Sequence, residues 1–238
     1  MRYFIANFKM YSTREMLLSF LEKVDVKKND DLFVGIAIGD VYLQHYRKLF
    51  KEKGFEVLGQ NVHYEENGAF TGNISVLQLK DIGVKYALIG HSETRVYIGQ
   101  DEVNERTRRA LKYGMRTVLC IGEPLETYEG MKSEAYLKNQ LSMIKTFDHL
   151  DHLIIAYEPI YAIGKKIASS EHIEKMIHMI KSHLKEETGF NIPVVYGGSV
   201  SPNNIANVLN IKGIDGVLVG KASIDPVSFN EIMSQFGK

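Results

Sequence analysis

The chain has 238 residues, enough for one large domain or two small ones, and its 45% hydrophobic and 24% charged residues are typical of a globular protein. Lysine plus arginine and aspartate plus glutamate number 29 each, so the overall charge favours neither nucleic acid nor an anionic membrane. The one cysteine, Cys120, excludes an internal disulfide and fits a reducing compartment; it lies in an apolar run, and we interpret its thiol as structural, not nucleophilic.

Short apolar runs with the length of buried strands recur along the chain, separated by amphipathic stretches with helical spacing. The runs are Tyr3–Ala6, Leu32–Ile38, Val57–Gln60, Tyr86–Gly90, Thr117–Gly122, Leu153–Tyr157, Pro193–Tyr196 and Gly216–Val219. No linker rich in Pro, Gly or Ser divides them. The alternation predicts an α/β fold, a closed (β/α)8 barrel of eight parallel strands with surrounding helices, in which residues 1–238 form a single domain.

Capping residues support this division into helices. Polar residues that favour helix starts are followed by helical patterns, prolines fall at first-turn positions, and a glycine follows the helix 170–188. The predicted starts are Thr13, Asp101, Ser170, Ser201 and Asp225, the prolines are Pro202 and Pro226, and the terminating glycine is Gly189.

Chemistry-bearing residues directly follow several predicted strands. In a barrel of this kind, the carboxyl ends of the strands surround one mouth, where barrel enzymes place their active sites. In chain order these residues are Asn7 and Lys9, His91 and Glu93, Glu158, Ser199, and Gly220. The fold therefore predicts that residues distant in sequence meet at this mouth.

Glu158 is the strongest candidate for a catalytic base. It ends the apolar run Leu153–Tyr157, and Pro159 favours an extended conformation at the residue before it. The apolar, glycine-containing stretch 160–164 that follows is an unusual composition for a surface turn unless the loop closes over something. A carboxylate at a strand end, followed by such a loop, predicts a general base beneath a lid.

His91 is a candidate electrophile. Ser92 and Glu93 follow it in what we interpret as a short helix start, whose positive end would keep the imidazole neutral. A neutral imidazole can donate a hydrogen bond to a substrate carbonyl and move a proton between neighbouring oxygens. We expect Glu93 to hold Lys9 or nearby backbone and not to react.

Several stretches, in the same order along the chain, resemble the triosephosphate isomerase family. The segment 156–168 is similar to the family's catalytic-base strand and mobile lid, and six other stretches agree with it. They are Ala6–Met10, Gly68–Gly72, Gly90–Glu93, Cys120–Glu123, Tyr196–Val200 and Gly216–Gly220. The resemblance implies a TIM barrel that interconverts dihydroxyacetone phosphate and glyceraldehyde 3-phosphate through an enediolate, as an intramolecular isomerase of glycolysis and gluconeogenesis.

The resemblance also implies roles for individual residues. Glu158 would move the carbon-bound proton, and its pairing with a neutral His91 follows the known chemistry of this family, in which a Glu base acts with a neutral imidazole. The ammonium of Lys9 would stabilise negative charge that develops on the substrate, with Asn7 supporting it by hydrogen bonding. No cofactor or metal is implied.

Glycines at the last two strand exits indicate a phosphate site. At Gly197–Ser199 and Gly216–Gly220, the missing side chains let backbone N–H groups approach an anion, and Gly164 would add another from the lid. We therefore expect Gly164, Ser199 and Gly220 to bind the substrate phosphate.

The stretch Gly68–Gly72 resembles the protruding loop through which the family forms its dimer. By this resemblance, Thr71 would enter the neighbouring chain near its Lys9 and Glu93, so that a homodimer is the active unit. The alternative is an ordinary turn that contains two glycines.

Two departures from the family pattern affect the proposed site. After Gly164 the lid continues as 165–168, one residue shorter than is usual, and Lys221 replaces a small residue after Gly220. A long cation there would either strengthen phosphate binding or obstruct the backbone amides. A weakly active or non-catalytic phosphate-binding barrel is therefore the alternative function, and a barrel enzyme for a larger sugar phosphate is a second.

Other classes of function find little support. His149 and His152 lack a cluster of further ligands at metal-binding spacing, so we expect no metal. No apolar run approaches the length of a membrane span, and the first nine residues do not have the pattern of a signal peptide. We expect a cytoplasmic protein that acts on a small phosphorylated substrate, with neither a nucleic-acid nor a membrane partner.

Overall fold

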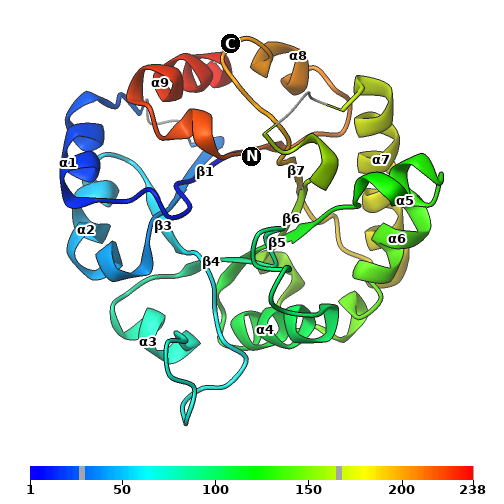
Figure 1. Cartoon of the computed structure of the whole chain (residues 1–238), viewed down its shortest axis with the longest axis horizontal. Helices are drawn as coiled ribbons and strands as arrows, with labels where there is room; N and C mark the ends of the chain where they lie inside the picture. Colours follow the sequence, from blue (N-terminus) through cyan, green and yellow to red (C-terminus); the bar gives the residue numbers. More distant parts are fainter. Residues whose placement is uncertain (27–29, 165–167, 238) are drawn as a thin grey trace.

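The computed structural model describes residues 1–26, 30–164 and 168–237, and its strands form one closed parallel barrel (Figure 1). Each strand pairs with the next along the chain, and β1 closes the barrel against β8. The strands are β1 (Arg2–Asn7), β2 (Leu32–Ala37), β3 (Glu56–Gly59), β4 (Tyr86–Ile89), β5 (Arg116–Ile121), β6 (Leu153–Tyr157), β7 (Val194–Tyr196) and β8 (Gly216–Val219). Each agrees within one residue at either end with its predicted apolar run, so the predicted (β/α)8 barrel is confirmed.

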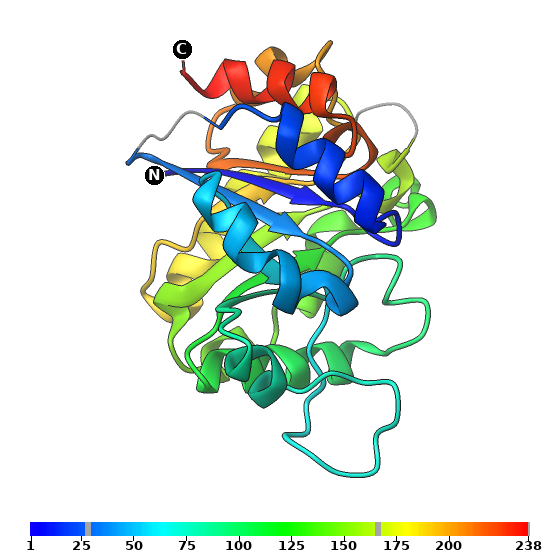
Figure 2. The ribbon, with the colours of Figure 1, turned by 90° about the vertical axis from the view of Figure 1, so that its left-hand side faces the viewer.

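Helices surround the strands and lie on the outside of the barrel (Figures 1 and 2). The α-helices are α1 (Arg14–Lys23), α2 (Asp40–Glu52), α3 (Val76–Asp81), α4 (Gln100–Lys112), α5 (Leu125–Glu129), α6 (Ser133–Gln140), α7 (Ser170–Thr188), α8 (Ile205–Leu209) and α9 (Pro226–Ser234). Short 3-10 turns are η1 (Ile144–Thr146), η2 (Leu150–His152), η3 (Ile160–Ala162), η4 (Lys221–Ser223) and η5 (Gln235–Gly237). In the described parts of the chain, no helix has both the length and the apolar character needed to cross a membrane.

Two of the predicted helix starts are confirmed by their caps. The Thr13 hydroxyl accepts a hydrogen bond from the Met16 N–H, and the Asp225 carboxylate accepts one from the Ser228 N–H, with Pro226 in the first turn. Gly189 ends α7 in the left-handed conformation, with φ of 76°, as predicted.

Three predicted starts need correction. The cap of α7 is Ser169, one residue before Ser170. Asp101 lies inside α4, whose cap is Gly99. Ser201 lies before the helix start, because α8 begins at Ile205 with Asn204 as its cap; the Asn204 side chain accepts the Ser201 N–H, and 202–204, with Pro202, form a turn. Local side-chain bonding thus replaces the expected first turn.

Alternation along the strands divides the core into two layers. Residues pointing inward fill the barrel, among them Ile5 of β1, Leu88 of β4 and Val195 of β7. Residues pointing outward pack against the helices; Phe4, for example, lies with its ring centre 4.8 Å from that of Phe229 on α9. A filled barrel leaves the strand ends as the places where polar side chains can gather.

Candidate active site

A cavity of about 1110 Å³ lies at the carboxyl ends of the strands. Nearly all the residues predicted to form the site line it, although they come from widely separated parts of the chain. They are Asn7, Lys9, His91, Glu93, Glu158, Gly164, Ser199, Gly220 and Lys221. The barrel therefore brings the predicted catalytic and phosphate-binding residues to one place.

Glu158 is held as a buried carboxylate at the end of β6. Its backbone N–H donates to the carbonyl of Ile121 at 2.7 Å, which continues the pairing of β6 with β5, and only 3% of the residue is exposed. Burial raises the pKa of its carboxyl group above the ordinary value. The neighbouring His91 imidazole, a hydrogen bond from the Cys120 thiol, the positive charge of Lys9 and the Ser92 backbone N–H oppose this shift without cancelling it.

The space for Glu158 depends on two glycines. A Cβ on Gly197 would lie 2.5 Å from the Glu158 Cγ, and one on Gly122 would lie 1.7 Å from its carbonyl oxygen. Both distances are far below van der Waals contact. We predicted that the glycines after β7 let amides approach a phosphate; the structure assigns Gly197 the additional task of making room for the carboxylate.

His91 lies directly beside Glu158 at the mouth. Its Nε2 lies 3.5 Å from the Glu158 Oε1, while the Glu93 backbone N–H donates to its Nδ1 at 3.2 Å. Since a backbone N–H can only donate, Nδ1 carries no proton, and the ring is neutral with its proton on Nε2. The predicted helix start is wrong, because residues 92–97 form turns and α4 begins only at Gln100. A local hydrogen bond, and not a helix terminus, accounts for the neutral ring.

Arg95 fixes the segment that carries His91, a role that the sequence analysis did not identify. Its guanidinium donates to the carbonyl of Gly90 at 2.7 Å, to that of Cys120 at 2.8 Å and to the side chain of Gln100 at 2.7 Å. Burial lowers the pKa of Arg95. In the sequence, this arginine resembles a surface charge, and the only available signal was its position four residues after His91.

Lys9 adopts a strained backbone conformation beside the cavity. Its φ is 49°, in the left-handed region that costs roughly 1 kcal/mol or more for a residue with a side chain. The Asn7 side chain accepts the Lys9 N–H at 3.0 Å, and the Gln60 side chain donates to the Lys9 carbonyl at 2.7 Å. Asn7 thus hydrogen-bonds to the backbone of Lys9 and not to its ammonium; the contact with Gln60 was not predicted.

The side chain of Lys9 is directed by Glu93. Its Nζ lies 2.6 Å from the Glu93 Oε1, and Lys9 is one of the two partners expected for this carboxylate. Glu93 therefore acts twice, orienting the ammonium through its side chain and His91 through its backbone.

The predicted phosphate side of the cavity is formed by the exits of β7 and β8. The Ser199 hydroxyl donates to the carbonyl of Ala162 at 2.6 Å, so in this conformation its proton is engaged with the stretch that follows Glu158. Lys221 is exposed, lines the cavity and has no ion-pair partner in the described parts of the chain. A Cβ on Gly220 would lie 3.4 Å from the Lys9 Cε, so this glycine leaves space beside the ammonium.

The first part of the predicted lid is described, and its tip is not. Tyr161 on η3 stacks on Tyr128 of α5 with ring centres 4.5 Å apart, and Gly164 is exposed with φ of 68°. The shortened stretch at residues 165–167 lies outside the described residues.

Thr71 lies away from this cavity. Together with His63, Thr71 lines a separate hollow. The loop that carries Thr71 protrudes from the barrel (Figure 2). Phe70 of this loop packs on His63, with ring centres 4.5 Å apart. Within one chain, therefore, Thr71 does not contribute to the site.

A metal centre finds no support among the residues that the structure describes. They contain no group of three or more His, Cys, Asp and Glu side chains arranged to hold a metal ion.

The closed parallel barrel and its polar mouth define a barrel enzyme with a buried carboxylate opposite a neutral imidazole. The sequence model of the family described as triosephosphate isomerase matches residues 2–236. The triosephosphate isomerase of Ureaplasma parvum serovar 3 is 40% identical over 236 residues, covering 99% of both chains. That of Mycoplasmoides gallisepticum is 41% identical over 98% of this chain and 97% of its own. The chain belongs to the triosephosphate isomerase family.

The contact between Gly197 and Glu158 generates a first prediction. Gly197→Ala should displace the carboxylate and lower kcat/KM by about 100-fold, since a shift of roughly 1 Å at a reacting group has effects of that size. Steady-state isomerase kinetics measure this. Gly99→Ala is the matched control, because a Cβ at Gly99 has open space and φ there is −77°. Equal activity of both variants would contradict the account.

The raised pKa of Glu158 generates a second prediction. Below the ordinary Glu value of 4.5, the carboxyl is protonated in both folded and unfolded chains; as pH rises through the folded pKa, the folded state must bury a charge and loses stability. Glu158→Gln, which cannot ionise, should therefore have a higher free energy of unfolding than wild type at pH 8 and an equal one at pH 4.

Urea unfolding followed by circular dichroism measures the difference, with exposed Glu22→Gln as a control for the loss of one carboxylate. A gain from Glu158→Gln that is the same at both pH values would contradict the assignment.

Proposed function

We propose that the chain interconverts dihydroxyacetone phosphate and glyceraldehyde 3-phosphate through an enediolate, as an isomerase of glycolysis and gluconeogenesis. The observation that carries this is the buried Glu158 carboxylate 3.5 Å from the Nε2–H of a neutral His91. A base and a neutral donor side by side at the cavity suit proton removal from a carbon beside a carbonyl, with the donor serving the carbonyl oxygen.

The reaction moves two protons. Glu158 takes the proton from the carbon beside the carbonyl, and the Nε2–H of His91 donates to the carbonyl oxygen as negative charge develops there. Glu158 then returns a proton to the neighbouring carbon, and His91 moves the proton between the two oxygens. The raised pKa of Glu158 makes it a stronger base than an exposed carboxylate.

Charge on the enediolate is stabilised by Lys9, whose ammonium is oriented by Glu93. Asn7 supports Lys9 by accepting a hydrogen bond from its strained backbone. The phosphate binds at the exits of β7 and β8, through amides near Ser199 and Gly220 and through Gly164 of the lid. We propose that Lys221, exposed at this end of the cavity, adds an attractive charge.

A weakly active or non-catalytic phosphate-binding barrel is the alternative function. It rests on the shortened lid and Lys221, and no contact in the described chain favours it. A binding protein would also have no evident need for a buried base opposite a neutral donor.

We further infer that residues 1–238 act as one domain and that the protein works in the cytoplasm as a homodimer. The single Cys120 supports a reducing compartment. The protruding loop with Thr71 supports the dimer, since its exposed residues gain contacts only against another surface. Neither a nucleic-acid nor a membrane partner is proposed.

Turnover of glyceraldehyde 3-phosphate by the purified protein tests the function. Wild type should turn over the substrate, and Glu158→Gln should reduce kcat by about 10³-fold, as loss of a general base does. In the same assay, Lys221→Gly should raise KM and leave kcat nearly unchanged. Wild-type turnover no higher than that of Glu158→Gln, in a folded dimer, would favour the non-catalytic alternative.

Sedimentation velocity tests the dimer. Wild type should sediment at twice the chain mass, and Thr71→Glu should shift it toward the monomer because a charge would enter the neighbouring chain. Val227→Glu, an exposed substitution on α9, is the control and should remain dimeric. A Thr71→Glu protein as dimeric as wild type would contradict the role of the loop.

A further inference from the structure

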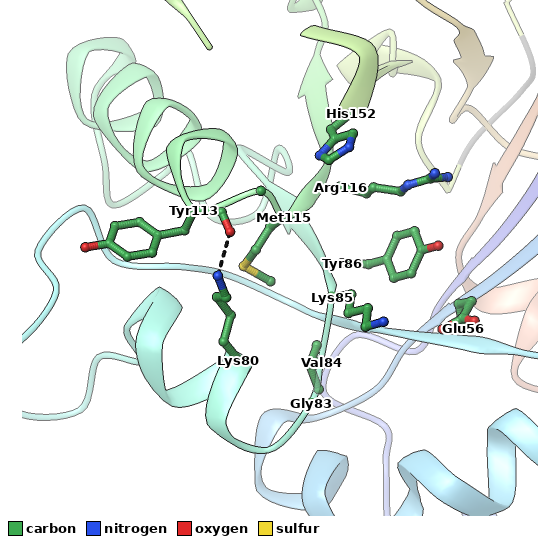
Figure 3. Close-up of a pocket in the computed structure, with 11 residues that line it drawn as sticks. Glu56, Lys80, Gly83, Val84, Lys85, Tyr86, Tyr113, Met115, Arg116 and His152 are labelled. Atoms are coloured by element: carbon green, nitrogen blue, oxygen red, sulfur yellow. Dashed lines mark hydrogen bonds between the residues drawn. The ribbon is translucent and has the colours of Figure 1, made fainter. Parts of the chain in front are cut away.

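A second cavity of about 500 Å³ lies at the opposite end of the barrel, among the amino ends of β3, β4 and β5 (Figure 3). Its walls include Lys85 and Tyr86 at the start of β4, and Met115 and Arg116 at the start of β5. Strand β4 separates it from the mouth, because Tyr86 begins that strand and His91 follows its far end. Its volume lies within the range of small-molecule sites, roughly 300–1,000 Å³.

Positive charge dominates this cavity. Lys80, Lys85 and Arg116 line it, and Glu56 is the one carboxylate among its lining residues. No carboxylate of the described chain lies within ion-pair distance of these three cations. The lining therefore carries an excess of positive charge.

Lys85 and Arg116 approach this cavity from different faces of the sheet. The Arg116 N–H donates to the Lys85 carbonyl at 2.9 Å, but the strand register pairs Arg116 with Tyr86, so alternation turns the Lys85 side chain toward the other face of the sheet. The guanidinium of Arg116 lies 6.0 Å from the ring centre of Tyr86, at the limit of a cation–π contact.

Tyr113 holds the third cation, Lys80, in place. Lys80 donates to the Tyr113 carbonyl at 2.8 Å and lies 5.5 Å from the centre of the Tyr113 ring, which ties α3 to the end of α4 (Figure 3).

His152 lines the same cavity, and its buried Nδ1 has no hydrogen-bond partner in the described chain, while its Nε2 lies 3.5 Å from Asp151. A buried polar atom without a partner is uncommon and indicates a missing one.

We propose that this cavity binds a small phosphorylated anion with two or more negative charges. Arg116 would contact phosphate oxygens through its planar guanidinium, and Lys85 and Lys80 would supply further charge-assisted hydrogen bonds. Such a ligand would neutralise cations that have no ion-pair partner in the described chain. The site is separate from the isomerase mouth, and the proposal does not depend on the reaction there.

Methionine methyl groups provide a reporter for each cavity, since Met115 lines this one and Met10 lines the mouth. Protein with 13C-labelled methionine methyls is titrated with inorganic pyrophosphate at constant ionic strength and followed by NMR. The Met115 resonance, assigned with Met115→Leu, should shift in a saturable way with Kd below about 1 mM, an affinity equivalent to about 4 kcal/mol.

A double variant, Lys85→Gln with Arg116→Gln, should weaken the response of Met115 at least tenfold and leave any response of Met10 unchanged. Lys51→Gln with Lys138→Gln, which removes two exposed charges elsewhere, is the matched control and should keep the wild-type Kd. Arg116→Lys keeps the charge and should retain most of the binding.

A linear, non-saturating shift of Met115 would overturn the proposal. So would an equal loss of binding in the matched control, because it would mean that overall charge alone attracts the anion. Circular dichroism of each variant confirms that a lost response comes from a folded protein.

Discussion

The site depends on a single constraint, the burial of a carboxylate at the open end of a filled barrel. Removing Glu158 from water costs free energy when it is charged, and this cost raises its pKa. The chain tolerates the cost because β6 is fixed on both sides, by β5 and by β7. A base with this strength and position is what proton removal from carbon requires.

The surrounding residues either leave space for the buried Glu158 or position the groups beside it. Gly122 and Gly197 lack side chains where the backbone and side chain of Glu158 need the space. Arg95 fixes the turn that carries His91 by hydrogen-bonding to carbonyls on two strand exits. Lys9 accepts a strained backbone so that its ammonium meets Glu93 at the cavity. Most of these contacts join residues from different strands, so the closed barrel is what assembles the site.

Much of this was predictable from the sequence because strand burial and strand order leave local signals. The run that ends in Glu158 and Pro159 is apolar, short and interrupted at a definite point, and a parallel barrel then fixes which end carries the chemistry. Resemblance to the family supplied the roles of Lys9 and His91, which their spacing alone would not have given.

What the sequence could not show depends on tertiary neighbours. A buried Arg95 and a surface arginine look the same until the fold places carbonyls around the guanidinium. The steric role of Gly197 requires the position of a side chain from another strand. The start predicted after His91 was wrong because a polar pair was interpreted as a cap where the chain forms turns.

The most direct test of the central claim is hydrogen exchange between solvent and the substrate carbon. Dihydroxyacetone phosphate is incubated in deuterated water with wild type or with Glu158→Gln, and deuterium at the carbon beside the carbonyl is measured by NMR. The account predicts incorporation with wild type and its loss with Glu158→Gln. Incorporation at an unchanged rate with Glu158→Gln would show that another group moves the proton.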